Sequence, residues 1–262
     1  MSDDYSRFDA LSFLRTRYAN LEAERSQFYR RCFHEFYQKY HTQWDTATTR
    51  LLEFGGGPSI VPLISAAPFV SEIVFAEYAE SNRKEVQLWK DNNPNAYDWS
   101  PYFEDIVNKL EGNADSEASK VRERILRNRI RRVIPCDIKA DEKSLLGGED
   151  VQEQFDIISQ SACIETTVNS PSEFQECLAK LKTLLKPGGL LIGVQGLGAS
   201  WYEVQGLKYH AFPLNEEEVL TSFQQAGFTI LEKQNTSTAI TDTAGHALNS
   251  AVGLIFVVAK AT

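Results

Sequence analysis

Leu51-Leu52-Glu53-Phe54-Gly55-Gly56-Gly57-Pro58 is the stretch that decides the fold, because an apolar segment runs directly into a glycine turn. Glycine lets the backbone turn sharply and approach a ligand that a Cβ atom would exclude. The next apolar segment, residues 73–76, is followed by the acidic residue Glu77. A carboxylate at the end of a second strand can accept hydrogen bonds from both hydroxyls of a ribose. The two features predict a nucleoside pocket at the carboxyl edge of a parallel sheet.

Apolar strand patterns and helical patterns alternate along much of the chain, which predicts an open, mostly parallel sheet with helices on both faces. We expect strands at residues 50–54, 71–76, 130–136, 154–160, 190–194, 228–233 and 254–259. We expect helices from residue 59 onward and at 82–90, 174–185 and 216–225. Lys186-Pro187-Gly188-Gly189 is expected to end a helix and turn the chain into the fifth strand. The last two strands have no helix between them, which indicates an antiparallel pair at one edge.

Two segments lie outside this alternation. Residues 21–41 carry apolar side chains near helical spacing, and a short aromatic helix is expected at 8–18. These patterns predict that residues 1–45 form a helical lid. Residues 94–128 form a helical insert that begins with a turn bracketed by prolines. With 262 residues and 42% hydrophobic composition, the chain is long enough for one large domain spanning 1–262.

Charge and cysteine content narrow the class of protein. The net charge of −9 disfavours a nucleic-acid partner and an anionic membrane. The basic cluster Arg122, Arg124, Arg127, Arg129, Arg131 and Arg132 is interpreted as the solvated face of a helix that runs into a strand. The four cysteines show no Cys-x-x-Cys spacing, which favours reduced thiols and no metal site. An acidic N-terminus and the absence of a long apolar run lead us to expect a cytoplasmic protein.

The cofactor follows from the spacing of these features. A glycine turn with a distal acid fits either a dinucleotide or S-adenosylmethionine, but the Gly-x-Gly-x-x-Gly spacing that seats a pyrophosphate is missing. Asp137 ends the third strand, where it can bond an adenine amino group while Ile138 packs on the ring. A Lys-Pro-Gly-Gly turn and a terminal strand pair are typical of class I methyltransferases. These features favour S-adenosylmethionine over a nicotinamide cofactor.

The chain resembles the nicotinamide, phenylethanolamine and indolethylamine N-methyltransferases from near residue 8 to its C-terminus. The matching segments are Phe13-Leu14-Arg15-Thr16-Arg17-Tyr18, Glu53-Phe54-Gly55-Gly56-Gly57-Pro58-Ser59-Ile60, Tyr97-Asp98-Trp99-Ser100-Pro101, Leu110-Glu111-Gly112-Asn113, Val133-Ile134-Pro135-Cys136-Asp137, residues 184–189 and Ser200-Trp201-Tyr202. The resemblance implies a Rossmann-like class I methyltransferase fold, an α/β architecture with a mostly parallel seven-stranded sheet, an antiparallel edge pair and an N-terminal helical cap.

The resemblance also implies which residues hold the cofactor. They are Phe13, Tyr18, Gly55, Gly56, Gly57, Glu77, Tyr78, Asn82, Asp137, Ile138 and Ser161. Tyr18 would close over the amino-acid end of the cofactor, with Phe13 standing where the family usually has tyrosine. Glu77 would hold the ribose hydroxyls where the family usually has aspartate. Val61 stands where the family commonly has a tyrosine, so one cofactor contact is lost.

A small-molecule methyl acceptor is implied, and the residues expected to line its pocket are Tyr18, Gln195, Ala199, Tyr202 and Ala211. The nicotinamide enzyme has an aspartate in place of Gln195 and serines in place of Ala199 and Ala211. Because those groups grip the carboxamide, nicotinamide is not the expected acceptor. A loop at residues 242–249, longer than in the relatives, is expected to reshape this pocket.

Methyl transfer from a sulfonium requires alignment and exclusion of water rather than a nucleophilic side chain. An alkylammonium acceptor must first lose a proton, and the candidate bases are His210, Glu165 and Asp242. The leading hypothesis is therefore a monomeric S-adenosylmethionine-dependent methyltransferase acting on a small amine or a pyridine. The alternatives are a thiol or thioether acceptor, a catalytically silent cofactor-binding homologue, and an NAD-dependent dehydrogenase.

Overall fold

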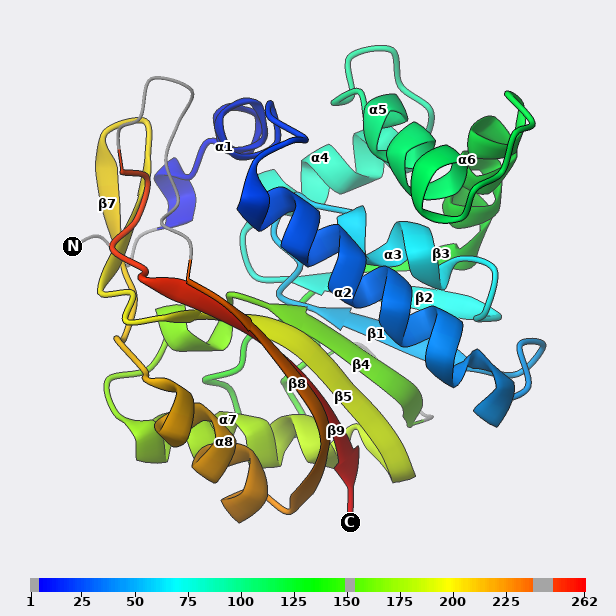
Figure 1. Ribbon diagram of the computed structural model, residues 1–262. Helices are drawn as coiled ribbons and strands as arrows, with labels where there is room; N and C mark the ends of the chain where they lie inside the picture. Colours follow the sequence, from blue (N-terminus) through cyan, green and yellow to red (C-terminus); the bar gives the residue numbers. More distant parts are fainter. Residues whose placement is uncertain (1–4, 149–153, 238–246) are drawn as a thin grey trace.

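A seven-stranded sheet forms the centre of the protein, with strand order β3-β2-β1-β4-β5-β9-β8 (Figure 1). The computed structural model describes residues 5–148, 154–237 and 247–262. The strands are β1 (Arg50–Phe54), β2 (Glu72–Glu77), β3 (Ile130–Pro135), β4 (Phe155–Ser161), β5 (Leu185–Leu197), β8 (Phe228–Thr236) and β9 (Gly253–Ala261). Strands β1 to β5 pair in parallel, whereas β9 is antiparallel to both β5 and β8. The predicted sheet and its antiparallel edge pair are confirmed.

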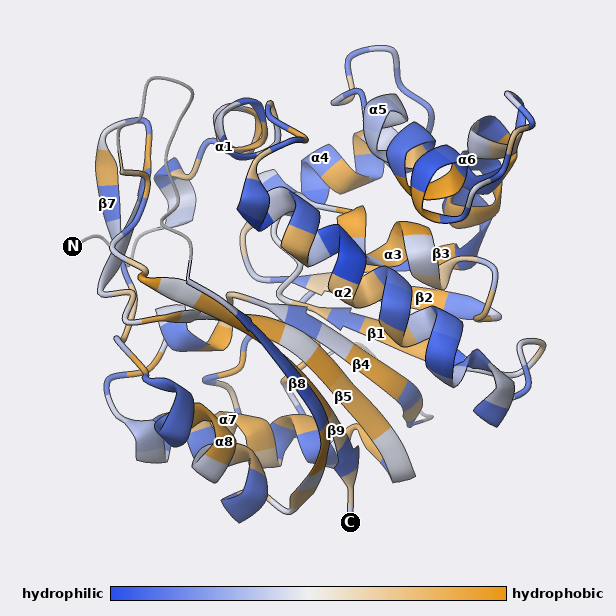
Figure 2. Ribbon diagram, viewed as in Figure 1, coloured by the Kyte–Doolittle hydropathy of each residue, from blue (hydrophilic) through white to orange (hydrophobic). Residues whose placement is uncertain are grey.

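Helices cover both faces of this sheet. They are α1 (Ala10–Arg17), α2 (Glu24–Tyr40), α3 (Val61–Ala66), α4 (Glu80–Lys90), α5 (Ser100–Glu104), α6 (Ala118–Arg129), α7 (Pro171–Thr183) and α8 (Glu216–Gln225), with short 3-10 helices at Tyr5–Arg7, His41–Gln43 and Ile164–Thr166 and a π-helix at Asp105–Leu110. In Figure 1, α2 crosses one face of the sheet, and α7 and α8 lie against the other. Figure 2 shows β4 and β5 as largely apolar, as strands buried on both faces must be.

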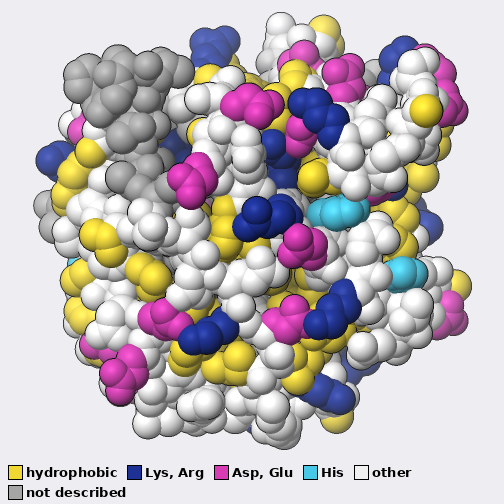
Figure 3. Space-filling model, in the orientation of Figure 1, with side chains coloured by type: hydrophobic (Ala, Val, Ile, Leu, Met, Phe, Trp, Pro, Cys, Tyr) yellow, Lys and Arg dark blue, Asp and Glu magenta, His cyan; other side chains and the backbone are white. Residues whose placement is uncertain are grey.

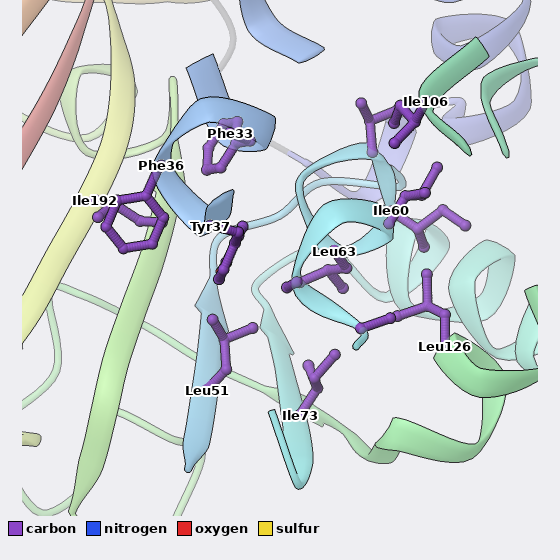
Figure 4. Close-up of a cluster of buried hydrophobic side chains, with 14 of the residues drawn as sticks. Phe33, Phe36, Tyr37, Leu51, Ile60, Leu63, Ile73, Ile106, Leu126 and Ile192 are labelled. Carbon is purple, nitrogen blue, oxygen red and sulfur yellow. The ribbon is translucent and has the colours of Figure 1, made fainter. Parts of the chain in front are cut away.

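The larger core lies between α2 and the sheet. Phe33, Phe36 and Tyr37 of α2 point toward Leu51 of β1 and Ile192 of β5 (Figure 4). These side chains recur at helical spacing on one face of α2, so their burial fixes the helix across the strands. A second core packs α7 and α8 on the opposite face. With both faces covered, the strand ends are held in fixed positions around the carboxyl edge.

Three local predictions need correction. The helix expected from residue 59 begins at Val61 and is only six residues long. The turn expected at residues 186–189 lies within β5, because the pairing of β4 with β5 moves from Leu185 to Leu190 across a bulge. A separate two-stranded hairpin, β6 (Trp201–Val204) and β7 (Leu207–His210), was not predicted. Its strands are four residues each, too short for a clear alternating pattern.

The basic cluster belongs to α6 and β3, as the sequence interpretation proposed. Arg122 forms an ion pair with Glu111 at 2.8 Å, and Arg127 one with Glu123 at 2.5 Å. On the face shown in Figure 3, Lys and Arg side chains of the described residues lie among Asp and Glu side chains. Arg122 and Arg127 therefore have local acidic partners and are mostly covered, whereas Arg124 and Arg131 are exposed, so only part of the cluster forms a solvated face.

The N-terminal segment and the hairpin lie over the carboxyl edge of the sheet. Asp9 caps α1 by accepting a hydrogen bond from the backbone N–H of Ser12 at 2.8 Å. Phe8 packs with Tyr209 and Val204 of the hairpin in a small separate cluster. α1 contributes Leu14 to the larger core and Phe13 to the cluster on the hairpin, so the N-terminal segment and the hairpin together form a roof over the strand ends.

Candidate active site

A cavity of about 740 Å³ opens beneath this roof at the carboxyl ends of β1, β2, β3 and β4. The lining includes every residue that the resemblance implied for the cofactor: Phe13, Tyr18, Gly55, Gly56, Gly57, Glu77, Tyr78, Asn82, Asp137, Ile138 and Ser161. These residues come from six separate segments of the chain. The parallel topology brings them together because parallel strands end at one edge of the sheet.

The glycine turn forms one wall of the cavity. Gly55 and Gly57 have φ of +66° and +60°, a region that side-chain-bearing residues rarely adopt. A Cβ on Gly55 would lie 2.6 Å from Sγ of Cys163, and one on Gly56 would lie 2.7 Å from the ring of Phe75. Backbone conformation therefore requires glycine at position 55, and close packing requires glycine at positions 55 and 56.

Glu77 follows the turn across the cavity wall. Its carboxylate accepts hydrogen bonds from the backbone N–H of Gly57 at 2.9 Å, from that of Ala79 at 2.8 Å and from the side-chain amide of Asn82 at 3.0 Å. Burial raises the pKa of Glu77 above its ordinary value, and these three donors act in the opposite direction. The carboxylate thus ties the glycine turn to the start of α4 and lines the cavity.

The purine end predicted from Asp137 and Ile138 lies just after β3. The side chain of Asp137 accepts a hydrogen bond from the backbone N–H of Lys139 at 2.8 Å, and its own N–H donates to the carbonyl of Leu145 at 3.0 Å. Ile138 is buried and contributes an apolar surface to the cavity. A carboxylate next to a buried aliphatic side chain matches a ring that carries an exocyclic amino group.

Two buried polar atoms along this wall make no hydrogen bond of normal geometry within the described part of the chain, Oδ1 of Asn82 and Oγ of Ser161, although Ser161 interacts with the hydroxyl of Tyr29. Both residues line the cavity. Buried polar atoms in native proteins normally have hydrogen-bond partners, so these two indicate that a polar ligand completes the site. The glycine turn, the carboxylates of Glu77 and Asp137, and these free atoms fit the ribose, purine and methionine parts of S-adenosylmethionine.

Aromatic rings line one wall of the cavity, where the acceptor is expected. Tyr202 of β6 stacks on Tyr209 of β7 with ring centroids 5.2 Å apart, and its hydroxyl lies 2.8 Å from that of Tyr5. Tyr5 also stacks on Phe8, at 5.9 Å. Phe13 completes the same aromatic cluster. Flat apolar walls of this kind suit a planar ring or an organic cation.

Glu165 lies in the 3-10 helix after β4, and it is the buried carboxylate at this acceptor end. Its Oε1 accepts a hydrogen bond from the backbone N–H of Gly196 at 2.8 Å, whereas Oε2 has no partner among the described residues. Burial raises the pKa of Glu165 to about 7. A carboxyl group with one anchored oxygen, one free oxygen and a near-neutral pKa can take up a proton from a bound ligand.

The other predicted acceptor and base residues divide into three groups. Ala199, Tyr202 and Ala211 line the cavity with His210, whose Nε2 lies 2.9 Å from the carbonyl oxygen of Val168. That carbonyl only accepts, so Nε2 carries the proton and His210 has a structural partner. Gln195 is fully buried but does not line the cavity. Asp242 lies outside the described residues.

Gln195 points away from the site because side chains alternate along a strand. Its neighbours Val194 and Gly196 line the cavity, while its register partner on β9, Ile255, packs in the α7 and α8 core. The placement of Gln195 in the acceptor pocket is therefore wrong for this structure. Neither atom of its amide group has a partner within the described residues.

Several lining residues were not found from the sequence, namely Tyr5, Phe8, Arg17, Arg25, Tyr29, Cys136, Cys163, Thr166, Thr167, Asn169, Trp201, Asn249 and Leu254. Asn249 belongs to the predicted loop at 242–249. Thr166, Thr167 and Asn169 follow β4, and their position after a strand end is a signal that could have identified them. The aromatic residues before α1 carry no comparable signal, because their contacts are with the hairpin.

Glu53 lies beneath the glycine turn and gives a first testable prediction. It is fully buried, neither carboxyl oxygen makes a hydrogen bond of normal geometry to a described residue, and burial raises the pKa of Glu53 to about 8. The unfolded chain ionises near its ordinary pKa of 4.5. Folding therefore favours the protonated form, and the stability that it contributes is lost as the pH rises from 4.5 toward 8.

Replacing Glu53 with Gln is expected to reduce that loss by about 1–3 kcal/mol between pH 5 and 8, measured as the free energy of unfolding in urea at each pH. Glu176→Gln on the exposed side of α7 is the control and leaves the pH profile unchanged. An identical slope in wild type and Glu53→Gln would show that Glu53 is ionised in the folded state.

The described residues lack a membrane-spanning helix and a metal-binding cluster. No helix among them is both long enough and apolar enough to cross a membrane. No group of three or more His, Cys, Asp or Glu side chains among them is arranged to hold a metal ion. All four cysteines are free thiols, and three of them are buried.

Comparison with known proteins places this site in a family. The model of the NNMT/PNMT/TEMT family matches residues 1–262. The chain is 30% identical to phenylethanolamine N-methyltransferase of Bos taurus over 225 residues, which is 84% of this chain and 77% of that enzyme. It is 32% identical to nicotinamide N-methyltransferase of Homo sapiens over 180 residues, which is 69% of this chain and 66% of that enzyme.

Solved structures agree on the fold. A S-adenosylmethionine-dependent methyltransferase from Clostridium acetobutylicum superposes with a TM-score of 0.54 at 9% identity, covering 93% of this chain and 96% of that one. The CurJ carbon methyltransferase gives a TM-score of 0.57 at 14% identity, and the match covers 96% of this chain and 57% of that one. The fold is thus that of the class I methyltransferases. The chain belongs to the NNMT/PNMT/TEMT family and is an S-adenosylmethionine-dependent N-methyltransferase.

Proposed function

We propose that the acceptor is a small aralkylamine and that Glu165 is the base that prepares it for methylation. The observation that carries this proposal is the free Oε2 of a buried carboxyl group with a pKa near 7 at the aromatic end of the cavity. An alkylammonium has no lone pair until it loses a proton, so it needs such a group. A pyridine nitrogen needs none.

When bound, S-adenosylmethionine supplies a methyl group activated by a sulfonium. The chain's own residues hold and orient the reactants. Glu77 and Asp137 accept hydrogen bonds from the sugar and the purine, and Tyr18 closes one side. Glu165 takes the ammonium proton on Oε2, while the Gly196 N–H holds Oε1 in place. The roof over the cavity excludes water, so the amine stays unprotonated until transfer.

The walls of the acceptor pocket favour an aromatic amine over nicotinamide. Ala199 and Ala211 are buried, line the cavity and offer no hydroxyl to a carboxamide. Gln195 does not reach the cavity and so contributes no hydrogen bond. Tyr202 and its stacked neighbours instead offer a flat surface for a ring. The N-methyltransferase relatives support a nitrogen acceptor, and the thiol or thioether alternative is not favoured.

We also propose that residues 1–262 form a single methyltransferase domain, with residues 1–45 as lid and 94–128 as insert. It would act as a cytoplasmic monomer and have no nucleic-acid partner. The cavity is built from residues of one chain, which supports a monomer. The net charge of −9 argues against nucleic acid, and the free thiols fit a reducing compartment.

The test is an acceptor panel with donor labelled at the methyl group. The enzyme is incubated with 2-phenylethylamine, nicotinamide, a small aromatic thiol and no acceptor, and label transfer is counted. We expect transfer to the aralkylamine at a kcat/KM at least tenfold above that for nicotinamide. Preferential labelling of nicotinamide or of the thiol would overturn the proposed acceptor class. Absence of transfer to all three, in enzyme that binds S-adenosylhomocysteine, would point to the silent homologue.

A further inference from the structure

Two arginines line the cavity beside the glycine turn without a carboxylate partner. Arg17 and Arg25 border both the main cavity and a small recess that adjoins it. Tyr18, Tyr29 and Val61 line the same recess. Val61 begins α3, directly after the glycine turn, so the recess lies next to that turn.

Arg17 is held at this position by backbone oxygens. One terminal nitrogen donates to the carbonyl of Leu248 at 2.5 Å and to that of Glu203 at 3.3 Å, whereas Nε has no partner among the described residues. Arg17 is 9% exposed, and burial, followed by the nearby charge of Arg25, lowers its pKa to about 9. Glu203 favours the charged form of Arg17 but makes no ion pair with it. A buried cation without an ion-pair partner is costly, so this arrangement calls for an anion.

Arg25, the second residue of α2, has no ion pair or hydrogen bond from its side chain within the described residues. Two other arginines, Arg30 of α2 and Arg122 of α6, do have acidic partners. The distance from side-chain nitrogen to carboxylate oxygen is 2.7 Å for Arg30 and Asp105 and 2.8 Å for Arg122 and Glu111. Arg15 and Arg124 also have no ion pair among the described residues, but both are exposed, whereas Arg17 is buried. Lys139, another cation of the lining, is 3.0 Å from Glu173.

The anion that fits this place is a carboxylate at the end of the cofactor opposite the purine. Asp137 and Glu77 mark the purine and ribose positions. The glycine turn lines the same cavity, and Val61, which begins the helix after that turn, lines the recess. Phe13 and Val61 border the arginines without a hydroxyl. Tyr18, Ser26, Tyr29 and Tyr102 bring hydroxyls to the recess but no positive charge. Glu165 at the acceptor end would repel a carboxylate. A guanidinium binds a carboxylate through two parallel hydrogen bonds.

We propose that Arg17 and Arg25 form the subsite that binds the α-carboxylate of the methionine part of S-adenosylmethionine. The two side chains supply the positive charge that the rest of the recess lacks. The inference depends on the cofactor and not on which acceptor is methylated.

The test compares two ligands by titration calorimetry, S-adenosylhomocysteine and 5′-methylthioadenosine, which lacks the amino-acid end. Arg25→Met is expected to weaken S-adenosylhomocysteine binding about 10- to 100-fold, the range of a lost charged hydrogen bond. The same variant should bind 5′-methylthioadenosine with an affinity within about twofold of wild type. Arg25→Lys keeps the charge and should fall between. The control is Arg31→Met, because Arg31 is exposed on the same helix.

Equal losses for both ligands would mean that the substitution disturbs the whole pocket, and unchanged affinities would mean that Arg25 binds nothing there. Either result overturns the proposal. A third outcome also overturns it, namely unchanged S-adenosylhomocysteine binding with a raised KM for an acceptor that bears a carboxylate, since the arginines would then serve the acceptor. Failure of every acceptor to be methylated would leave the calorimetry interpretable, so the two proposals are tested separately.

Discussion

Glu77→Ala is expected to weaken S-adenosylhomocysteine binding at least about 100-fold, because hydrogen bonds to a charged group contribute about 1.5–3 kcal/mol each and a ribose offers two. The carboxylate lines the cavity and is already held in place by Gly57, Ala79 and Asn82. A preorganised acceptor loses little entropy on binding, so most of the interaction appears as affinity. Titration calorimetry at pH 8 measures the effect.

The pH dependence of binding gives the same prediction a second readout. Burial raises the pKa of Glu77, and the ionised form is the better acceptor for two hydroxyls. Cofactor affinity in the wild type should therefore increase as the pH rises through that pKa, and Glu77→Ala should lose this part of the increase. Glu80→Ala, at an exposed position three residues along, is the matched control and keeps wild-type behaviour.

Loss of binding in Glu77→Ala could also follow from a collapsed glycine turn, because Glu77 holds the N–H of Gly57. Glu77→Gln separates the two effects: its amide oxygen can still accept from that N–H, but it carries no charge. We expect Glu77→Gln to retain the wild-type thermal midpoint within a few degrees while binding the cofactor weakly. Wild-type affinity in both variants would remove Glu77 from the cofactor site.

The glycine turn, Glu77 and Asp137 could be predicted because each is tied to a local pattern, whereas other cofactor residues, such as Tyr18 and Asn82, came from the resemblance to the family. The glycines follow β1, Glu77 ends β2 and Asp137 follows β3. Once the strands are recognised as parallel, their carboxyl ends must meet at one edge, and so must these residues. The mostly parallel sheet and both packing faces follow from the same alternation, whereas the strand order does not and is known only from the structure.

The acceptor half depends on contacts that no local pattern encodes. Gln195 was misplaced because β5 extends from Leu185 across a bulge, and which side chains face the cavity depends on the register beyond it. Arg17 and Arg25 come from α1 and α2, whose positions are set by packing on the hairpin and on the sheet. Glu165 was only one of three candidate bases until its burial and its free oxygen were seen.

Glu165→Gln is the second substitution with a large expected effect. Proton transfer by a positioned side chain contributes about 10²–10⁴-fold to rate, so kcat for an aralkylamine should fall by about that factor. Glutamine keeps the size of the side chain and an oxygen that can accept from the Gly196 N–H, so the pocket should remain intact. Glu176→Gln, exposed on α7, should keep wild-type kcat.

The pH profile identifies the role of Glu165 more directly than the rate does. Burial raises the pKa of Glu165 to about 7, and only the ionised form can take up a proton. The rate with an aralkylamine should therefore rise as the pH increases through about 7 in the wild type, and Glu165→Gln should lack this rise. Because a pyridine nitrogen has no proton to lose, the variant should methylate a pyridine acceptor within about threefold of wild type. A loss of equal size with both acceptors would show that Glu165 only shapes the pocket, since a group that acts as a base affects only the acceptor that carries a proton.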